Sequence, residues 1–365
     1  MIPIAKPSID DNEIEAVNKV LLSGNLAQGA KVHQLEEDFA KYCGTKYAIA
    51  VNSGTAAIHA ALFAAGVTAG DEVITTPFSF IATVNPILML GAHPIFVDID
   101  PKTFNIDVSK IESVITHKTK AIVSVDLYGQ PADYDELRKI AHKHKLKIIE
   151  DSCQSVGAEY KNKKTGSLGD MGCFSLYATK NIMCGEGGIV TTNNLEYAKK
   201  IRSFRQHGMT EVYEYDHLGF NYRMSDLHAA IAVEQVKKID MFNRKRLSNA
   251  LHFNKGLKGI TGIDLPIIKE DRTHAFHQYT IRINQKSNLG RDQILKKIRS
   301  NGIGAGVYYP KPLHIYPHIS KLGYKIGDFP NAEQASREVI SIPVHPDLTA
   351  EDIRHIVKTI KDINE

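Results

Sequence analysis

Lys180 lies between a hydrophobic run and a cluster of glycines, in the stretch CFSLYATKNIMCGEGG (173–188). Lysines mostly occupy solvated surfaces, but in this stretch the only other charged residue is Glu186. An amine at the edge of a sheet, beside glycine-rich turns, can be partly desolvated, which lowers its pKa and makes it a nucleophile toward a carbonyl group. Lys180 is therefore the first candidate for covalent chemistry.

A second signal lies in the stretch NSGTAA (52–57), where a predicted strand ends and a helix begins. Gly54 allows the backbone to turn sharply and to approach a ligand closely. The first free amides of the helix suit an anion such as phosphate, and the hydroxyl groups of Ser53 and Thr55 can add hydrogen bonds. The same residues also fit an ordinary helix cap, so this motif alone leaves both interpretations open.

A third signal is the acid at the end of a predicted buried strand in IIEDSCQSVGA (148–158). An unpaired carboxylate is costly in such a place, so Asp151 should meet a cation or a ring N–H. An N-cap for the following segment is the alternative interpretation. Gln154 stands three residues further on and can reach the same ligand.

These groups together match what pyridoxal 5'-phosphate (PLP) requires of a protein. An amine forms the Schiff base, an acid keeps the pyridine nitrogen protonated, and a helix start holds the phosphate. Phe80, which follows the predicted strand EVITT (72–76), can stack on the cofactor ring. Ligands collect at the carboxyl ends of the strands in an open parallel sheet, so we expect the site there.

The elements that must position these residues are short β-branched runs alternating with helical patterns. Most of the runs are apolar on both faces, as parallel strands covered by helices are. The predicted strands are YAIAVN (47–52), EVITT (72–76), PIFVD (94–98), KAIVSVD (120–126), KIIED (147–151), CFSLY (173–177) and GIVTT (188–192). This alternation predicts an α/β domain with a mainly parallel sheet.

The pattern changes after about residue 245. RDQILKKIRSNG (291–302) and EDIRHIVKTIKDI (351–363) are amphipathic helices, and QYTIRI (278–283) and VISIPV (339–344) are strand-like. We therefore expect a large domain over residues 1–245 and a smaller C-terminal α+β domain over residues 246–365.

Composition excludes several classes of protein. The 45 Lys and Arg residues barely exceed the 41 Asp and Glu residues and form no basic patch, so nucleic-acid binding is not expected. The four cysteines form no CxxC pair, the histidines show no metal-ligand spacing, and no apolar stretch is long enough to span a bilayer. We expect a reduced, cytoplasmic protein without a metal ion.

Six segments stand in order along the chain: SGNLAQGAKVHQLEEDFAKYCGTKYAIAVNSGTAA, EDSCQSVGA, FSLYATKNIMCGEGG, RSFRQHG, GFNYRMSD and YYPKPLH. With these segments in register, the chain resembles the DegT-type (nucleotide-)sugar aminotransferases over essentially its whole length. The resemblance implies PLP fold type I, the aspartate aminotransferase fold, with a mostly parallel seven-stranded sheet flanked by helices. A smaller α+β domain follows it in that fold.

The resemblance also implies roles for individual residues. Lys180 would hold PLP as a covalent imine and move the proton, Asp151 would pair with the ring nitrogen, and Gln154 would lie near the ring hydroxyl. The other implied cofactor contacts are Ser53, Gly54, Thr55 and Ser175 at the phosphate, Phe80 on the ring, and Asn221 at the phosphate of the neighbouring subunit. Tyr309 and His314 fall in segments that the family places near the substrate.

The activity implied by the resemblance is transamination of a keto group on a nucleotide-linked sugar, with L-glutamate as the amino donor, in amino-sugar biosynthesis. Asn221 implies a homodimer with shared active sites. Two alternatives stay open: a PLP enzyme acting on another keto substrate, such as a keto-cyclitol, and a PLP-binding regulatory protein without turnover. The sugar, the nucleotide and the carbon that is aminated do not follow from the sequence.

Overall fold

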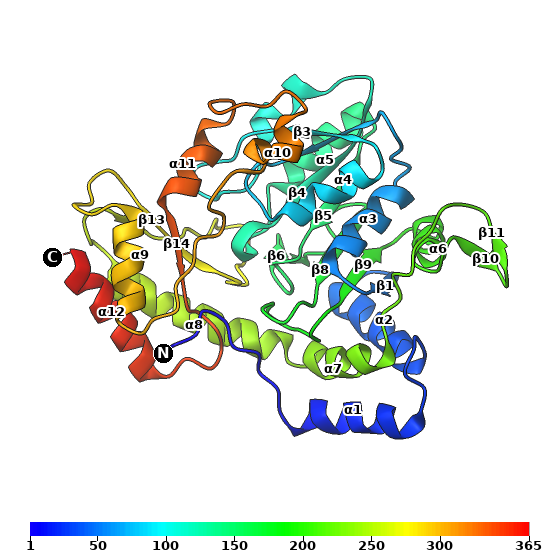
Figure 1. Ribbon diagram of the computed structural model, residues 1–365, viewed down its shortest axis with the longest axis horizontal. Coiled ribbons are helices and arrows are strands. Elements are labelled where there is room, and N and C mark those ends of the chain that lie inside the picture. Colours follow the sequence, from blue (N-terminus) through cyan, green and yellow to red (C-terminus); the bar gives the residue numbers. More distant parts are fainter. Residues whose placement is uncertain (365) are drawn as a thin grey trace.

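The protein is built around one seven-stranded sheet, shown in the computed structural model of Figure 1, which describes residues 1–364. The strands are β1 (Tyr47–Val51), β2 (Glu72–Thr75), β3 (His93–Phe96), β4 (Thr119–Val125), β5 (Lys147–Asp151), β8 (Met171–Ser175) and β9 (Gly188–Thr192). Their order is β1-β9-β8-β5-β4-β2-β3, and only β9 runs antiparallel to its neighbours. The predicted α/β fold with a mostly parallel sheet is confirmed.

Helices cover both faces of the sheet. One face packs against α3 (Gly54–Ala64) and α6 (Leu195–Phe204), and the other packs against α2 (Ala30–Cys43), α5 (Tyr134–His144) and α7 (Asp226–Val236). Successive residues of a strand point to opposite faces. In β5, accordingly, Ile149 joins the core under α3 and Ile148 joins the core under α5.

The remaining elements surround this body. The helices are α1 (Asp11–Ser23), α4 (Asn85–Met89), α8 (Ile239–Leu257), α9 (Arg291–Ser300), α10 (Pro317–Ser320), α11 (Pro330–Glu338) and α12 (Ala350–Asn364), with 3₁₀ turns η1 (Ile81–Thr83), η2 (Val108–Lys110), η3 (Glu112–Val114), η4 (Leu127–Gly129) and η5 (Leu313–Ile315). The short strands are β6 (Glu159–Tyr160), β7 (Lys163–Lys164), β10 (Met209–Glu211), β11 (Glu214–Tyr215), β12 (Ile263–Asp264), β13 (Tyr279–Ile283) and β14 (Val339–Ile342). Over residues 1–364, no helix combines the length and apolar character that crossing a membrane requires.

A second core lies to one side of the main sheet, where Figure 1 shows α9 and α12 beside the three-stranded antiparallel sheet β12-β13-β14. Ile356 and Ile360 of α12 are buried in it, as the amphipathic pattern predicted. Helix α8 runs without a break through residue 245: Phe242 packs into the core of the main sheet, whereas Phe253 packs into the second core. The division at 245/246 stays a prediction.

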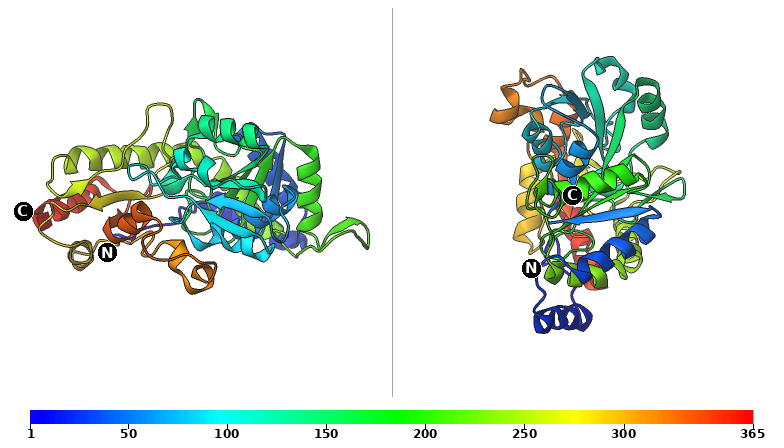
Figure 2. Two further views of the ribbon diagram at one scale, coloured as in Figure 1. Left: turned by 90° about the horizontal axis from the view of Figure 1, so that it is seen from above. Right: turned by 90° about the vertical axis from the view of Figure 1, so that its right-hand side faces the viewer.

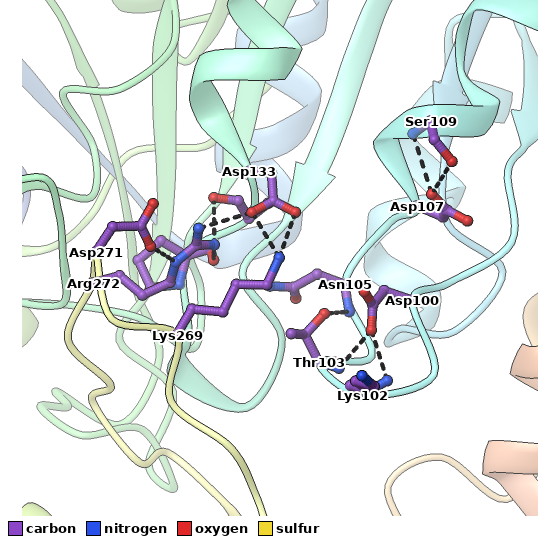
Figure 3. A network of polar contacts seen from close by, with 12 residues as sticks. Asp100, Lys102, Thr103, Asn105, Asp107, Ser109, Asp133, Lys269, Asp271 and Arg272 are labelled. Carbon is purple, nitrogen blue, oxygen red and sulfur yellow. Dashed lines mark hydrogen bonds and ion pairs between the residues drawn. The ribbon is translucent and has the colours of Figure 1, made fainter.

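The segment between α8 and β13 is fastened to the large body by charge pairs (Figure 3). Both carboxylate oxygens of Asp133 accept hydrogen bonds from Lys269 at 2.9 Å, and one also accepts from Arg272 at 2.8 Å. The Arg272 guanidinium also donates to the backbone carbonyl of Pro131 at 2.7 Å. Further along, the Ala275 amide donates to the Gly129 carbonyl at 2.8 Å. These contacts hold the residues that lead into β13 against the carboxyl edge of the sheet.

Candidate active site

A cavity of about 800 Å³ opens at the carboxyl ends of β1, β5 and β8. Its floor is formed by residues at or just after the ends of these strands: Ser53, Gly54, Thr55, Asp151, Cys153, Gln154, Ser175 and Lys180. Its other walls come from the segment after β2, from His277 just before β13, and from the chain after α9: Ser79, Phe80, Ile81, Thr83, His277, Tyr308, Tyr309, Lys311 and Tyr316. With Ile4 and Ala5, which also line it, seven separate stretches of sequence meet in one cavity, and most of the predicted site residues are among them.

Lys180 is carried on the turn between β8 and β9. Its backbone amide donates to the Tyr177 carbonyl at 2.9 Å, and the Cys184 amide returns to the Leu176 carbonyl at 2.9 Å, which closes the turn. The Lys180 side chain lines the cavity, and its Nζ has no hydrogen-bond partner within residues 1–364. Desolvation lowers the pKa of this amine, and the nearby Cys153 and Asp151 side chains oppose part of that shift. A lysine in this setting releases its proton more easily than a surface lysine.

Asp151 is buried at the last position of β5, and its carboxylate is held on one side. The Thr83 hydroxyl donates to Oδ2 at 2.7 Å, and the Ser79 hydroxyl lies 2.8 Å from the Thr83 hydroxyl. Because a carboxylate only accepts, Thr83 uses its single proton on Asp151, and Ser79 therefore donates to Thr83. Oδ1 receives only a long bond, 3.4 Å, from the Cys153 amide. The Asp151 carboxylate can therefore accept a further hydrogen bond from a cationic N–H.

The N-terminus of α3 lines the same cavity as Lys180. Ser53 is the N-cap, since its hydroxyl accepts from the Ala56 amide at 3.1 Å, so the helix-cap interpretation holds. A Cβ on Gly54 would lie 2.8 Å from the Cβ of Ser175 and 3.1 Å from the Cys153 sulfur, so only glycine lets the turn lie so close to the end of β8. Thr55 and Ser175 complete this corner of the cavity. Hydroxyls around a helix N-terminus fit a phosphate.

Gln154 and two aromatic rings occupy the opposite side. Gln154 accepts from the Tyr128 amide at 2.9 Å and donates to the Tyr309 hydroxyl at 3.1 Å, so Tyr309 is tied to the end of β5. Phe80 lines the cavity with 57% of its surface exposed, and its ring centre lies 6.1 Å from that of Tyr309. A large aromatic side chain this open is available to cover a flat ligand.

Two of the predicted residues lie elsewhere. His314 is fully buried outside the cavity lining, with Nε2 3.2 Å from the Glu333 carboxylate, and burial lowers its pKa. Asn221 is exposed at the surface, where its backbone carbonyl accepts from the Asn52 side chain at 3.3 Å, and it is not among the residues that line the cavity. The suggested roles of these two residues stay predictions.

Thr83 and His277 are two of the polar residues of the site that the sequence reasoning missed. Thr83 follows β2 in a 3₁₀ turn, and His277 precedes β13 on the segment fastened by Arg272. Neither stands in a motif, and each reaches the cavity through a tertiary approach that periodicity cannot reveal. Within residues 1–364 no group of three or more His, Cys, Asp or Glu side chains is placed to hold a metal ion.

This combination of sheet, lone amine, buried acid and helix N-terminus defines a PLP-binding fold of the aminotransferase type. The family model described as DegT/DnrJ/EryC1/StrS aminotransferase family matches residues 7–361. The chain belongs to this family of sugar aminotransferases.

Individual relatives agree with that membership. GDP-perosamine synthase of Caulobacter vibrioides is 37% identical over 366 residues, covering 99% of this chain and 98% of the relative. The crystal structure of S. venezuelae DesV in complex with a ketimine intermediate has a TM-score of 0.93 and 33% identity, covering 97% of this chain and 94% of the other. A putative sugar aminotransferase of Streptococcus pneumoniae in its PMP form reaches a TM-score of 0.95 at 28% identity, covering 100% and 99%.

PLP is therefore the cofactor of this protein. The residues of the cavity fit it on their own chemistry, because Lys180 offers an unpaired amine, Asp151 can accept a further hydrogen bond, and the N-terminus of α3 lies beside the hydroxyls of Thr55 and Ser175.

Proposed function

We propose that this protein transfers an amino group from L-glutamate to a keto group on a nucleotide-linked sugar. The observation that carries the proposal is the buried, unpaired amine of Lys180 in a cavity that also contains the buried Asp151. A volume of about 800 Å³ lies in the upper part of the range for small-molecule sites, roughly 300–1,000 Å³, which suits a cofactor together with a second, larger molecule. The name of the Caulobacter relative, GDP-perosamine synthase, supports a nucleotide-linked sugar.

When bound, PLP supplies an electron sink for the carbon from which a proton is removed. Asp151 would hold a positive charge at the ring nitrogen through its free oxygen. Lys180, with its lowered pKa, would attack as the free amine and then carry the proton. Gln154 would meet the ring hydroxyl, and Phe80 would cover the ring and exclude water.

The phosphate would be held by Ser53, Gly54, Thr55 and Ser175 at the start of α3. Beyond this corner, the aromatic rings of Tyr177, Tyr308 and Tyr316 and the amine of Lys311 line the outer part of the cavity. A base can stack on an aromatic ring and a lysine can pair with a diphosphate, so this outer part is where we place the nucleotide. The four cysteines are free, which agrees with a reaction in the reducing cytoplasm.

The two half-reactions test this proposal separately. The visible absorption of the PLP-loaded protein should change when L-glutamate is added, and 2-oxoglutarate should appear in equal amount. Adding a keto-sugar nucleotide should then restore the first spectrum, whereas the same sugar without its nucleotide should not. Lys180→Ala should abolish both changes, while Lys200→Ala, an exposed lysine on α6, should leave them intact.

Other outcomes would replace parts of the proposal. A spectrum that ignores glutamate but responds to another amino acid would change the donor. Reaction with a keto-cyclitol in place of every keto-sugar nucleotide would change the substrate. A bound cofactor that responds to no donor would favour a regulatory protein without turnover.

We further propose that the protein acts as a homodimer, with Asn221 reaching the phosphate in the partner's cavity. Two observations support this. Asn221 is exposed instead of lining its own cavity. The hairpin β10–β11 projects from the body in Figure 1 and in the left view of Figure 2, and it carries apolar side chains open to solvent, with Val212 80% and Tyr213 78% exposed. Apolar side chains gathered on a projecting hairpin are typical of an interface.

Mixing two inactive variants tests the shared site. Lys180→Ala and Asn221→Ala homodimers should each transaminate poorly. Heterodimers formed after mild dissociation should recover activity, because one of their two cavities then contains both native residues. A monomer by sedimentation velocity, or no recovery in heterodimers shown to form, would contradict the proposal.

A further inference from the structure

A chain of amides fixes the orientation of a histidine at the cavity wall. The Asn243 side chain donates to the Val156 carbonyl at 2.8 Å, so its oxygen faces Asn181 and accepts from the Asn181 amide nitrogen at 3.0 Å. That nitrogen also donates to the Ala275 carbonyl at 2.8 Å. Backbone carbonyls only accept, so neither amide can be reversed without placing an oxygen against an oxygen. The remaining oxygen of Asn181 then lies 3.3 Å from Nδ1 of His277.

His277 therefore carries its proton on Nδ1. The Asn181 oxygen can only accept, so the ring nitrogen that faces it must donate. Burial lowers the pKa of His277 well below its ordinary value, and the cations of Lys180 and Arg246 lower it further, so the ring is neutral. Its other nitrogen, Nε2, is left as a lone-pair acceptor.

Nε2 has no hydrogen-bond partner within residues 1–364, yet it is not sealed in the core as both ring nitrogens of His345 are. His277 lines the cavity together with Lys180. Nε2 of His277 is thus an acceptor without a donor. The Lys180 amine, whose charge acts on His277, is a donor without an acceptor. An ammonium group has three protons to donate, and an imidazole nitrogen is a suitable acceptor for one of them.

We propose that His277 is a positioning residue that accepts a hydrogen bond from the Lys180 amine whenever that amine is not bonded to the cofactor. This inference rests on the role proposed above for Lys180, and it adds an interaction that neither the family motif nor the relatives' names supply.

A neutral acceptor suits a lysine that must change its protonation state. A carboxylate at the same place would favour the ammonium form strongly and raise the pKa of the amine. A fully apolar wall would favour the free amine and leave it without orientation. The imidazole stabilises the ammonium form by one hydrogen bond, and the locked tautomer prevents Nε2 from becoming a competing donor.

The test uses the full chain loaded with pyridoxamine 5'-phosphate, a form in which the lysine amine is free. Brief exposure to isotope-labelled acetic anhydride over a range of pH, followed by peptide mass spectrometry, reports the pKa of Lys180. His277→Asn keeps a donor to Asn181 and removes the acceptor, so the Lys180 pKa should fall by about one unit, the size expected for losing a hydrogen bond to a charged group. His277→Gln places an amide oxygen near the position of Nε2 and should restore most of that shift.

Asn181→Leu keeps His277 but removes the partner that fixes its tautomer. The Lys180 pKa should then fall by less than in His277→Asn, because only part of the histidine population retains the acceptor at Nε2. Melting temperatures of all variants show whether a shift arises from lost packing. The proposal is overturned if His277→Asn leaves the Lys180 pKa in place, or if His277→Gln shifts it equally.

A third result would assign His277 a different role. If His277→Asn left the Lys180 pKa and the glutamate half-reaction unchanged but raised KM for the keto substrate, Nε2 would bind a substrate hydroxyl and the positioning role would be wrong. Failure of Lys180→Ala to alter the cofactor spectrum would instead contradict the proposed function, so the two failures are distinguishable.

Discussion

Two neighbouring acids of β5, Glu150 and Asp151, serve opposite faces of the sheet and have opposite surroundings. Glu150 points toward α5, is fully buried, and accepts from the backbone amides of Gly166, Leu168 and Gly169 at 2.6–2.7 Å. Asp151 points toward the cavity and receives one short bond, from a hydroxyl. Burial alone therefore does not separate a structural carboxylate from a functional one.

The difference lies in which donors are already present. The chain itself satisfies Glu150, since three amides converge on it and fasten the turn before β8 to the sheet. Asp151 receives a short bond on one oxygen and a long one on the other, and a buried carboxylate with unused acceptor capacity requires a cation or an N–H from outside the chain. The comparison predicts that substitution of Asp151 impairs reaction and substitution of Glu150 impairs folding.

The largest effect should follow Asp151→Asn. The amide keeps the size and the contact with Thr83 but loses the negative charge that would face the cofactor ring nitrogen. We expect kcat to fall by roughly 10²–10³-fold, as when a preorganised electrostatic partner is removed, with the free energy of unfolding of the cofactor-free chain almost unchanged. Single-turnover kinetics with glutamate measures the first quantity and urea denaturation the second. A loss of less than tenfold would mean that Asp151 is not the ring's partner.

Glu150→Ala should give the reverse pattern. Three buried amides would lose their acceptor, and we expect the free energy of unfolding to fall by about 3 kcal/mol. Activity per folded molecule should stay within a few-fold of the native value, because Glu150 does not line the cavity. Urea denaturation with active-site titration of the folded fraction measures both quantities. If activity fell as steeply as in Asp151→Asn, the two faces would not be independent.

Glu150 should also make the free energy of unfolding depend on pH. Burial and the nearby Asp126 raise the pKa of Glu150 to about 8, and burial raises the pKa of Asp126 to about 6. Between about pH 4.3, the ordinary value for Glu, and about pH 8, the folded chain binds a proton on Glu150 that the unfolded chain has released. Glu150 should therefore make the free energy of unfolding fall as pH rises through this window, by at most about 1.4 kcal/mol per unit from this one group, and the fall should level off above it. Asp126 adds to the fall below about pH 6.

Glu150→Gln provides the control for this pH dependence. Without the titrating group, the decline should end near the pKa of Asp126, about 6. Denaturation curves across the window would contradict the assignment if native and variant chains showed the same slope.

The contrast between the two acids also shows what sequence reasoning could reach. All seven strands of the main sheet were predicted, because parallel strands covered on both faces are continuous apolar runs bounded by polar residues. Asp151 and Lys180 were identified as candidates from the same boundaries, since a polar residue directly after such a run falls at the ligand-binding edge. Glu150, one residue earlier, was assigned no role, because its amide donors come from a turn whose path is set by tertiary packing.

His277 and Thr83, which complete the cavity, could not be predicted either, because tertiary packing and not local sequence pattern brings them to the site. His277 and Thr83 are brought in by segments that approach from elsewhere in the fold, His277 by way of the Asp133–Arg272 contacts and Thr83 by the turn after β2. His314 lies against Glu333 in the interior, a tertiary contact that its segment does not indicate, and its suggested role near the substrate stays a prediction. Local pattern therefore locates strand ends well and tertiary partners poorly.

The smallest of these effects should come from Thr83→Val, which tests what anchors Asp151. Valine keeps the shape and removes the hydroxyl, so Oδ2 of Asp151 loses its 2.7 Å bond while the carboxylate keeps its charge. We expect about tenfold weaker PLP binding or slower turnover, close to the net value of one hydrogen bond, because the opposing charge of the ring still orients Asp151.

Ser79→Ala is the matched control, because it removes the donor to Thr83 and keeps the bond from Thr83 to Asp151. Its effect, followed by equilibrium titration with PLP, should be smaller than that of Thr83→Val. Equal effects would mean that the whole hydroxyl chain, and not the bond to Asp151, holds the acid in place.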